Sequence, residues 1–322
     1  MESITLPYKT DDYGKPLLAK VCWSNDVKLQ DKAKPIVIIF HGGGMIVGSF
    51  DIIPQVQLQY LVSQNFLVVI PNYRLSPQVS ASEGGFADAA STLQWAQTQL
   101  PAILKAQHSI TVDPARVGTM GHSTGGTIAL WLAARSPTTV KATTAFYPSL
   151  YTSDITTDAH KPYSGTGFVF PPDFDPTPEN LAALSPPDTQ VSSAPLAPPG
   201  VPPTPRNIWQ VTHIKHGTWL KAIQPDGKYN LIDPCTLFAT VGANWPPTML
   251  VQGEEDQVPG SGLAAAERAV KELKEAGATD VRIEKVAGAA HMFDIMPTIG
   301  TADLGPKWVA VKRALDFLTE KV

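Results

Sequence analysis

The sequence predicts an α/β protein in which helices cover both faces of a mostly parallel central sheet. Two runs of consecutive apolar residues, 36–40 and 66–70, are rich in β-branched side chains. Such runs are typical of strands that are buried on both faces of a parallel sheet. Apolar residues also recur at helical spacing, as at Ala89, Leu93 and Ala96. This alternation of strand and helix predicts a series of βαβ units.

The first half of the chain contains most of the predicted strands. The N-terminal pair, joined by a turn at 12–14, is expected to enter the sheet antiparallel. Pro101 limits the helix that begins near residue 85, and Asp113-Pro114 forms a turn before the next strand. The expected strands are 3–9, 17–23, 36–40, 66–70, 116–120 and 141–147, and the expected helices are 54–64, 85–100 and 127–135.

The composition changes after residue 148. Of the 30 prolines, 13 lie between Pro162 and Pro205, where few runs have a regular period. Regularity returns with expected strands at 248–253 and 281–286 and helices at 261–276 and from Pro306 onward. We therefore expect an α/β core of residues 1–148 and 246–322, interrupted by a proline-rich cap or lid of residues 149–245.

Aromatic residues favour a packed cap over a disordered linker, because disordered segments are poor in them. The aromatic residues of this segment include Tyr163, Phe168, Phe170, Phe174, Trp209 and Trp219. The alternative is that residues 185–206 form a flexible, proline-rich surface loop.

Composition argues against several functional classes. The net charge is −4 without basic clusters, so neither a nucleic acid nor an anionic membrane is an expected partner. Cys22 and Cys235 are the only cysteines, which indicates no disulfide framework but leaves one bridge open. The N-terminus has no basic region followed by an apolar stretch, and every apolar run is too short to span a bilayer. We expect a cytoplasmic protein.

The segment 121–126 (Gly-His-Ser-Thr-Gly-Gly) joins a predicted strand to a predicted helix. A serine at such a tight turn is exposed above the sheet edge, and only very small residues fit two positions before and after it, here Gly121 and Gly125. The helix N-terminus also favours negative charge. A G-x-S-x-G match alone arises by chance in about one chain of this length in ten. The assignment of Ser123 as a nucleophile therefore needs support from other catalytic residues in the chain.

A serine hydroxyl requires a base within hydrogen-bond reach and a third group that orients the base. His291 lies in a loop of small residues after the last predicted strand, where it can reach the serine. Asp256 follows the preceding strand and is the expected acid, with Glu255 as the alternative. The order Ser123, Asp256, His291 is that of the α/β-hydrolase fold.

The segment 41–44 (His-Gly-Gly-Gly) directly follows a buried strand and offers unobstructed N–H groups. We expect Gly43, Gly44 and the Thr124 N–H to form an oxyanion hole, supported by Gly42. A nucleotide site is the alternative, but the chain lacks both the P-loop residues and the G-x-G-x-x-G spacing. His41 is expected to brace the loop. His122 is expected to pack beside the serine.

With these motifs the chain resembles the α/β-hydrolases of the hormone-sensitive-lipase-like group, found among bacterial and fungal carboxylesterases. The resemblance rests on 41–44, on 73–77 (Tyr-Arg-Leu-Ser-Pro, where the group usually has Y-R-L-A-P), on Asp113-Pro114 and on the segments of Ser123, Asp256 and His291. The group commonly has G-D-S-A-G-G at the elbow and H-G-F at the base, where this chain has His122 and Met292. No reacting group is lost by these differences.

These observations support three hypotheses. The first is a serine carboxylesterase that cleaves a small or medium acyl ester or lactone and needs no cofactor and no metal. The second keeps the fold and site but uses them for acyl transfer, lactonisation, C–C cleavage or cyclisation of a biosynthetic intermediate. The third is a ligand-binding protein on a hydrolase scaffold, against which the intact His291 argues.

Overall fold

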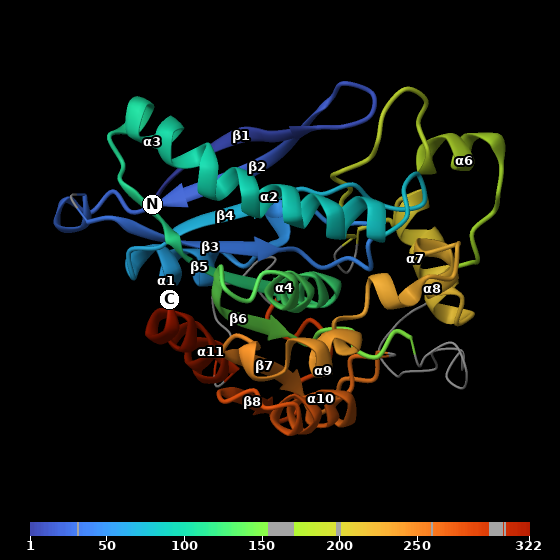
Figure 1. Ribbon diagram of the computed structural model, residues 1–322. Helices are drawn as coiled ribbons and strands as arrows, with labels where there is room; N and C mark the ends of the chain where they lie inside the picture. Colours follow the sequence, from blue (N-terminus) through green and yellow to red (C-terminus); the bar gives the residue numbers. More distant parts are fainter. Residues whose placement is uncertain (31, 154–170, 198–200, 259, 296–304, 306) are drawn as a thin grey trace.

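The computed structural model describes residues 1–30, 32–153, 171–197, 201–258, 260–295, 305 and 307–322. Its centre is an eight-stranded sheet with the order β1-β2-β4-β3-β5-β6-β7-β8 (Figure 1). The strands are β1 (Glu2–Thr10), β2 (Pro16–Trp23), β3 (Lys34–Phe40), β4 (Leu67–Pro71), β5 (Val112–His122), β6 (Val140–Phe146), β7 (Thr248–Gly253) and β8 (Val281–Val286).

The sheet is antiparallel at one edge and parallel elsewhere. β1 pairs antiparallel with β2, and β2 pairs antiparallel with β4. The strands from β4 through β8 then run parallel to one another. The antiparallel entry and the parallel core predicted from the sequence are confirmed. Because the carboxyl ends of parallel strands meet at one edge, the loops that follow β3, β5, β7 and β8 converge there.

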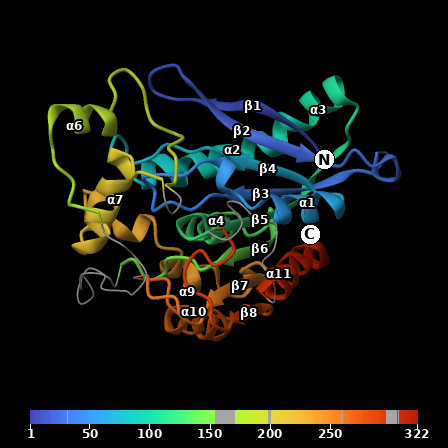
Figure 2. The ribbon, with the colours of Figure 1, turned by 180° about the vertical axis from the view of Figure 1, so that it is seen from behind.

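Helices cover both faces of the sheet. Ile36 and Ile38 of β3 pack in one cluster with α2, α3 and α4, whereas the alternating Val37 and Ile39 pack in another with α1 and α11. Figures 1 and 2 show the two layers from opposite sides. The helices are α1 (Gln55–Ser63), α2 (Ala87–Thr98), α3 (Leu100–His108), α4 (Thr124–Arg135), α10 (Leu263–Glu275) and α11 (Lys307–Lys321).

The helix expected over 85–100 and the strand expected over 116–120 are present, but the expected stop at Pro101 and the expected turn at Asp113-Pro114 were wrong. The helix is α2, which follows a π-helical turn (Ser82–Phe86), and a second helix, α3, begins at Leu100. Pro101 lies in the first turn of α3, where a missing N–H breaks no hydrogen bond, so it starts a helix instead of stopping one. The strand expected over 116–120 is also longer than predicted, because β5 starts at Val112. Asp113 and Pro114 lie within this strand, at a shift in the register between β3 and β5.

The segment 149–245 contains short helices that lie beyond the carboxyl ends of the parallel strands (Figure 1). Pro178 and Pro205 lie in the first turns of their helices, which explains how a proline-rich segment still forms them. The α-helices are α6 (Pro178–Leu184), α7 (Pro205–Lys215), α8 (Trp219–Ile223) and α9 (Phe238–Val241). Short 3-10 turns span Val27–Leu29, Phe50–Ile52, Tyr229–Leu231, Pro234–Leu237 and Gly242–Asn244.

The described part of 185–206 is joined to the core by backbone hydrogen bonds. The Leu75 N–H donates to the Val191 carbonyl over 2.8 Å, and Gly48 and Ala194 form an isolated β-bridge. These contacts indicate that this part of the segment packs against the core and is not a flexible loop. Tyr163, Phe168 and Phe170 lie outside the described residues. Cys22 and Cys235 are both free thiols.

Candidate active site

Ser123 lies in the tight turn between β5 and α4, with the backbone angles φ 54° and ψ −126°. A positive φ is strained for a residue with a side chain, and a packed surrounding must hold it. A Cβ atom at Gly121 would lie 2.1 Å from the Gly125 carbonyl oxygen, and one at Gly125 would lie 2.2 Å from that of Phe40. Both positions therefore require glycine, as the sequence pattern predicts.

The structure brings His291 between Ser123 and Asp256. The His291 Nε2 atom lies 2.9 Å from the Ser123 Oγ atom, and its Nδ1 atom lies 2.8 Å from the Asp256 Oδ2 atom. A carboxylate can only accept, so Nδ1 carries the proton and Nε2 accepts the serine O–H. The three side chains come from the β5–α4 turn, the loop after β7 and the loop after β8.

Asp256 is held by its own neighbours. It is 6% exposed, and its Oδ2 atom also accepts from the Gln252 side-chain amide over 2.9 Å. Its Oδ1 atom accepts from the Val258 backbone N–H over 3.0 Å. Glu255, the alternative acid, has an exposed side chain. The geometry therefore favours Asp256 as the partner of His291.

The glycine loop after β3 lies directly against the serine. A Cβ atom at Gly42 would be 3.3 Å from the Ser123 Cβ atom. Gly43 and Gly44 have φ angles of 118° and 63°. Within the described part of the chain, the amides of Gly43, Gly44 and Thr124 donate to no protein acceptor. Such free amides beside a nucleophile are suited to a carbonyl oxygen that gains negative charge.

His41 braces this loop, as predicted. Its Nδ1–H donates to the Gly42 carbonyl over 2.7 Å, and its ring stacks on Tyr73 with 4.2 Å between ring centroids. The Tyr73 hydroxyl donates to the His41 carbonyl over 2.8 Å. Complete burial lowers the pKa of His41 to about 4, so the ring is neutral at pH 7.

His122 packs beside the serine, as predicted, but it has partners that the sequence reasoning missed. Its ring stacks on Phe146, and its Nε2 atom faces the side chains of Gln57 and Asp294. Asp294 follows His291 by three residues, which is a signal that the sequence offers. Gln57 is 237 residues away from Asp294, and nothing in its sequence context points to the site.

Helices from the segment 149–245 contact the glycine loop. The Trp219 indole N–H of α8 donates to the Gly44 carbonyl over 2.9 Å. A Cβ atom at Gly44 would lie 2.6 Å from the Gln210 side-chain nitrogen of α7. Ser123 itself is 8% exposed. Little of the serine is therefore exposed, and α7 and α8 lie next to the glycine loop.

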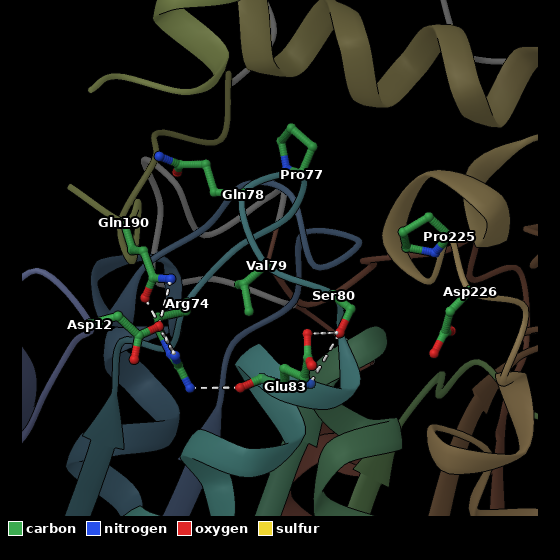
Figure 3. A pocket seen from close by; sticks show the side chains of 10 residues that line it. All are labelled: Asp12, Arg74, Pro77, Gln78, Val79, Ser80, Glu83, Gln190, Pro225 and Asp226. Carbon is green, nitrogen blue, oxygen red and sulfur yellow. Dashed lines mark hydrogen bonds and ion pairs between the residues drawn. The ribbon is translucent and has the colours of Figure 1, made fainter. Parts of the chain in front are cut away.

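A separate pocket of about 620 Å³ lies around Arg74 and Gln190 (Figure 3). None of the candidate site residues lines it. Arg74 uses all five of its N–H groups on protein acceptors, chiefly the buried Asp88. It has no donor left for a ligand, so the Tyr-Arg segment after β4 has a structural role here.

Among the described residues, no three His, Cys, Asp or Glu side chains are grouped to hold a metal ion. Of the helices that the structure describes, none has the length and apolarity to cross a membrane.

The curated relatives are much longer proteins. A non-reducing polyketide synthase of Aspergillus terreus is 30% identical over 327 residues, which cover 91% of this chain and 13% of the synthase. One of Penicillium roqueforti is 27% identical over 100% of this chain and 14% of its own length. The chain thus spans about one-seventh of the length of these relatives.

Solved structures of two esterases share the fold. That of Thermogutta terrifontis matches with a TM-score of 0.59 and 19% identity over 99% of this chain and 92% of its own. That of Pyrobaculum calidifontis matches with a TM-score of 0.61 and 19% identity over 99% and 84%. A model of a family with the alpha/beta hydrolase fold matches residues 37–295. The chain therefore belongs to the α/β-hydrolase fold family, in its hormone-sensitive-lipase-like group.

Proposed function

We propose that this protein is a serine hydrolase that cleaves the ester bond of a small or medium acyl ester or lactone through an acyl-enzyme on Ser123. One observation carries the proposal, the chain of hydrogen bonds from Ser123 through His291 to Asp256. Membership of a hydrolase-fold family supports the same reading.

In the proposed mechanism His291 Nε2 accepts the hydroxyl proton while Ser123 Oγ attacks the ester carbonyl. Asp256 keeps the proton on Nδ1 and stabilises the imidazolium that forms. The amides of Gly43, Gly44 and Thr124 bind the oxyanion. His291 then returns the proton to the leaving alcohol, and a water molecule, activated by the same imidazole, releases the acid.

Residues 149–245 act in this proposal as the cap over the site. The hydrogen bond from Trp219 to the Gly44 carbonyl, and the Gln210 side chain close to Gly44, support this role for two cap side chains. Both are able to discriminate between acyl groups by shape. Such a cap also excludes water from the developing charge, which strengthens the electrostatic stabilisation of the transition state.

A second candidate function is favoured by the names of the relatives. The relatives are non-reducing polyketide synthases, and this chain aligns with one portion of them. The same Ser123 acyl-enzyme would then be attacked by a nucleophile of the acyl chain or of a second substrate in place of water. The products would be a cyclised compound or a transferred acyl group.

The test uses the wild type and Ser123→Ala. p-Nitrophenyl esters and simple lactones report hydrolysis, and Ser123→Ala should lower kcat by roughly 10³- to 10⁶-fold. Unchanged activity of that variant would rule out the proposal. Polyketide-like acyl thioesters, followed by mass spectrometry of the products, separate hydrolysis from cyclisation and transfer. If a fluorophosphonate fails to label Ser123 while a small ligand still binds, the chain is a binding protein.

A further inference from the structure

A second histidine–aspartate pair lies behind the candidate nucleophile. His122 precedes Ser123 at the end of β5, and Asp294 follows His291 by three residues. The His122 Nε2 atom lies 3.2 Å from the Asp294 Oδ2 atom, and both side chains are completely buried. Nothing in the proposed mechanism uses this pair.

Asp294 joins four parts of the fold. Its Oδ2 atom accepts from the Gln57 side-chain amide of α1 over 2.7 Å and faces His122 of β5. Its Oδ1 atom accepts from the hydroxyl of Tyr147, the residue after β6. Asp294 itself belongs to the loop after β8. A single carboxylate thus connects the loop of His291 with two strand ends and a helix.

The hydrogen-bond pattern fixes the proton positions in this cluster. His122 Nε2 faces two acceptors, Asp294 Oδ2 and the Gln57 side-chain oxygen at 3.0 Å, so Nε2 carries a proton. Burial by itself raises the pKa of Asp294, but the charge and hydrogen bond of His122 and the hydrogen bonds of Tyr147 and Gln57 outweigh it and lower the pKa. Asp294 is therefore a buried carboxylate that accepts hydrogen bonds from Gln57, His122 and Tyr147.

Two features of the structure connect this cluster with His291. The His291 loop turns sharply, with a φ of 59° at Met292 and a hydrogen bond from the Ile295 N–H to the Met292 carbonyl. Fixing Asp294 therefore fixes the turn that carries His291. The Tyr147 ring also packs edge-on against the His291 ring, with 4.8 Å between centroids. The same tyrosine thus contacts the imidazole with its ring and Asp294 with its hydroxyl.

We propose that Asp294 is a positioning residue that, with His122, holds the His291 loop so that the imidazole stays in hydrogen-bond reach of Ser123. The inference rests on the proposed function, because it concerns the rate of Ser123 acylation. A displacement of about 1 Å at a reacting group is enough to lower a rate about 100-fold. The pair thereby contributes to catalysis without touching the substrate.

The main test is Asp294→Asn, which keeps the shape of the side chain but removes its charge and one acceptor. We expect kcat for p-nitrophenyl esters to fall about 10- to 100-fold with KM changed less than about threefold, because geometry and not binding is lost. The downfield proton NMR signal of the His291 Nδ1–H should broaden in the variant. A purely structural role would move neither kcat nor this signal at a temperature where the variant is folded.

Thr144→Val is the matched control. The Thr144 hydroxyl is buried and donates to the Ala314 carbonyl of α11 over 3.3 Å, and neither residue belongs to the candidate site or to the Asp294 cluster. This variant also loses a buried hydrogen bond and should keep the wild-type kcat. A kcat of Asp294→Asn that falls less than fivefold, in a folded sample, overturns the proposal.

Two further variants keep the proposal testable. If Asp294→Asn does not fold, Tyr147→Phe removes one hydrogen bond to Asp294 and leaves the ring against His291. Its kcat should fall at least threefold, and a wild-type kcat overturns the proposal. The double variant His122→Asn with Asp294→Asn should lose no more than the larger single effect, because both residues act as one unit. If the losses in kcat of the two single variants multiply in the double variant, the two residues do not act as one unit and the proposal is overturned.

Ser123→Ala separates the two levels of inference. If Ser123→Ala retains activity, the proposed function fails whatever Asp294 does. If Ser123→Ala is inactive and Asp294→Asn has the wild-type kcat, only the role of Asp294 fails.

Discussion

The two histidine–aspartate pairs of this protein contain the same chemical groups in different surroundings. His291 and Asp256 are 2.8 Å apart, and the His291 side chain is 11% exposed. His122 and Asp294 are 3.2 Å apart, and neither is exposed. The second nitrogen of His291 faces Ser123, whereas His122 Nδ1 is buried without a hydrogen-bond partner among the described residues. The residue types alone do not define a catalytic pair.

The two pairs differ in whether the histidine can act as a general base. A general base must reach the proton it takes and pass it on to a substrate group or to water. His291 satisfies the first condition, because its Nε2 atom lies at the Ser123 hydroxyl and its Nδ1 atom at the Asp256 carboxylate. Its side chain is also partly exposed, whereas the His122 side chain is completely buried and its Nδ1 atom has no partner among the described residues. The proposed roles are therefore proton transfer for the first pair and positioning for the second.

Of the substitutions in the two histidine–aspartate pairs, Asp256→Asn should have the largest effect. An amide at this position can hold His291 in the wrong tautomer, with the proton on Nε2, so that the base can no longer accept from Ser123. We expect kcat to fall about 10³- to 10⁴-fold with the fold retained, as measured by ester hydrolysis and circular dichroism. If Asp294→Asn loses more activity than Asp256→Asn, the roles of the two pairs are reversed.

Asp294→Asn should have a smaller effect, on the free energy of unfolding and on its pH dependence. The pKa of Asp294 is lowered in the folded protein, so its contribution is present above the unfolded value near 3.9 and is lost as the pH falls below it. Asp294→Asn should therefore lower the free energy of unfolding by about 1–3 kcal/mol at pH 7. Below about pH 4 the difference from the wild type should shrink, because the wild-type carboxyl becomes protonated too.

Urea unfolding of both proteins between pH 7 and pH 3 measures this difference. Titrating groups that do not contact Asp294, such as His41, are present in both proteins and cancel in the comparison. A difference that stays constant over the whole range would mean that the charge of Asp294 does not stabilise the fold.

The smallest effect should come from a pair on the surface. Lys271 and Glu275 of α10 lie 3.8 Å apart and are 75% and 63% exposed. Lys271→Ala should change the free energy of unfolding by less than about 0.5 kcal/mol, because water and salt screen such pairs. Thermal unfolding at low and high salt measures it. A loss as large as that of Asp294→Asn would show that burial does not set the difference between these ion pairs.

Much of the fold could be predicted because strong local patterns agreed with one another. The uninterrupted apolar runs of β3 and β4 required burial on both faces, and both strands are fully buried. Pro101 misled the prediction because proline both ends helices and begins them, and only the chain around it decides between the two. In the same way, Asp113 and Pro114 signal a turn locally but lie within β5, where neighbouring strands shift register.

The same division holds for the candidate site. Ser123, Asp256, His291 and the glycine loop stand at strand ends, and chain order with small neighbours identified them. Gln57 and Tyr147 stand in ordinary helical and strand contexts. Their side chains meet Asp294 only after the strands are ordered in the sheet.

The sequence by itself therefore determined the fold class, the elbow and the candidate reacting groups, because glycine spacing and buried strands are local requirements of the backbone. The tertiary structure decided which of the two histidines beside the serine faces it and which one is enclosed. That choice depends on the packing of β5, β6, α1 and the loop after β8, whose contacts join residues up to 237 positions apart in the chain.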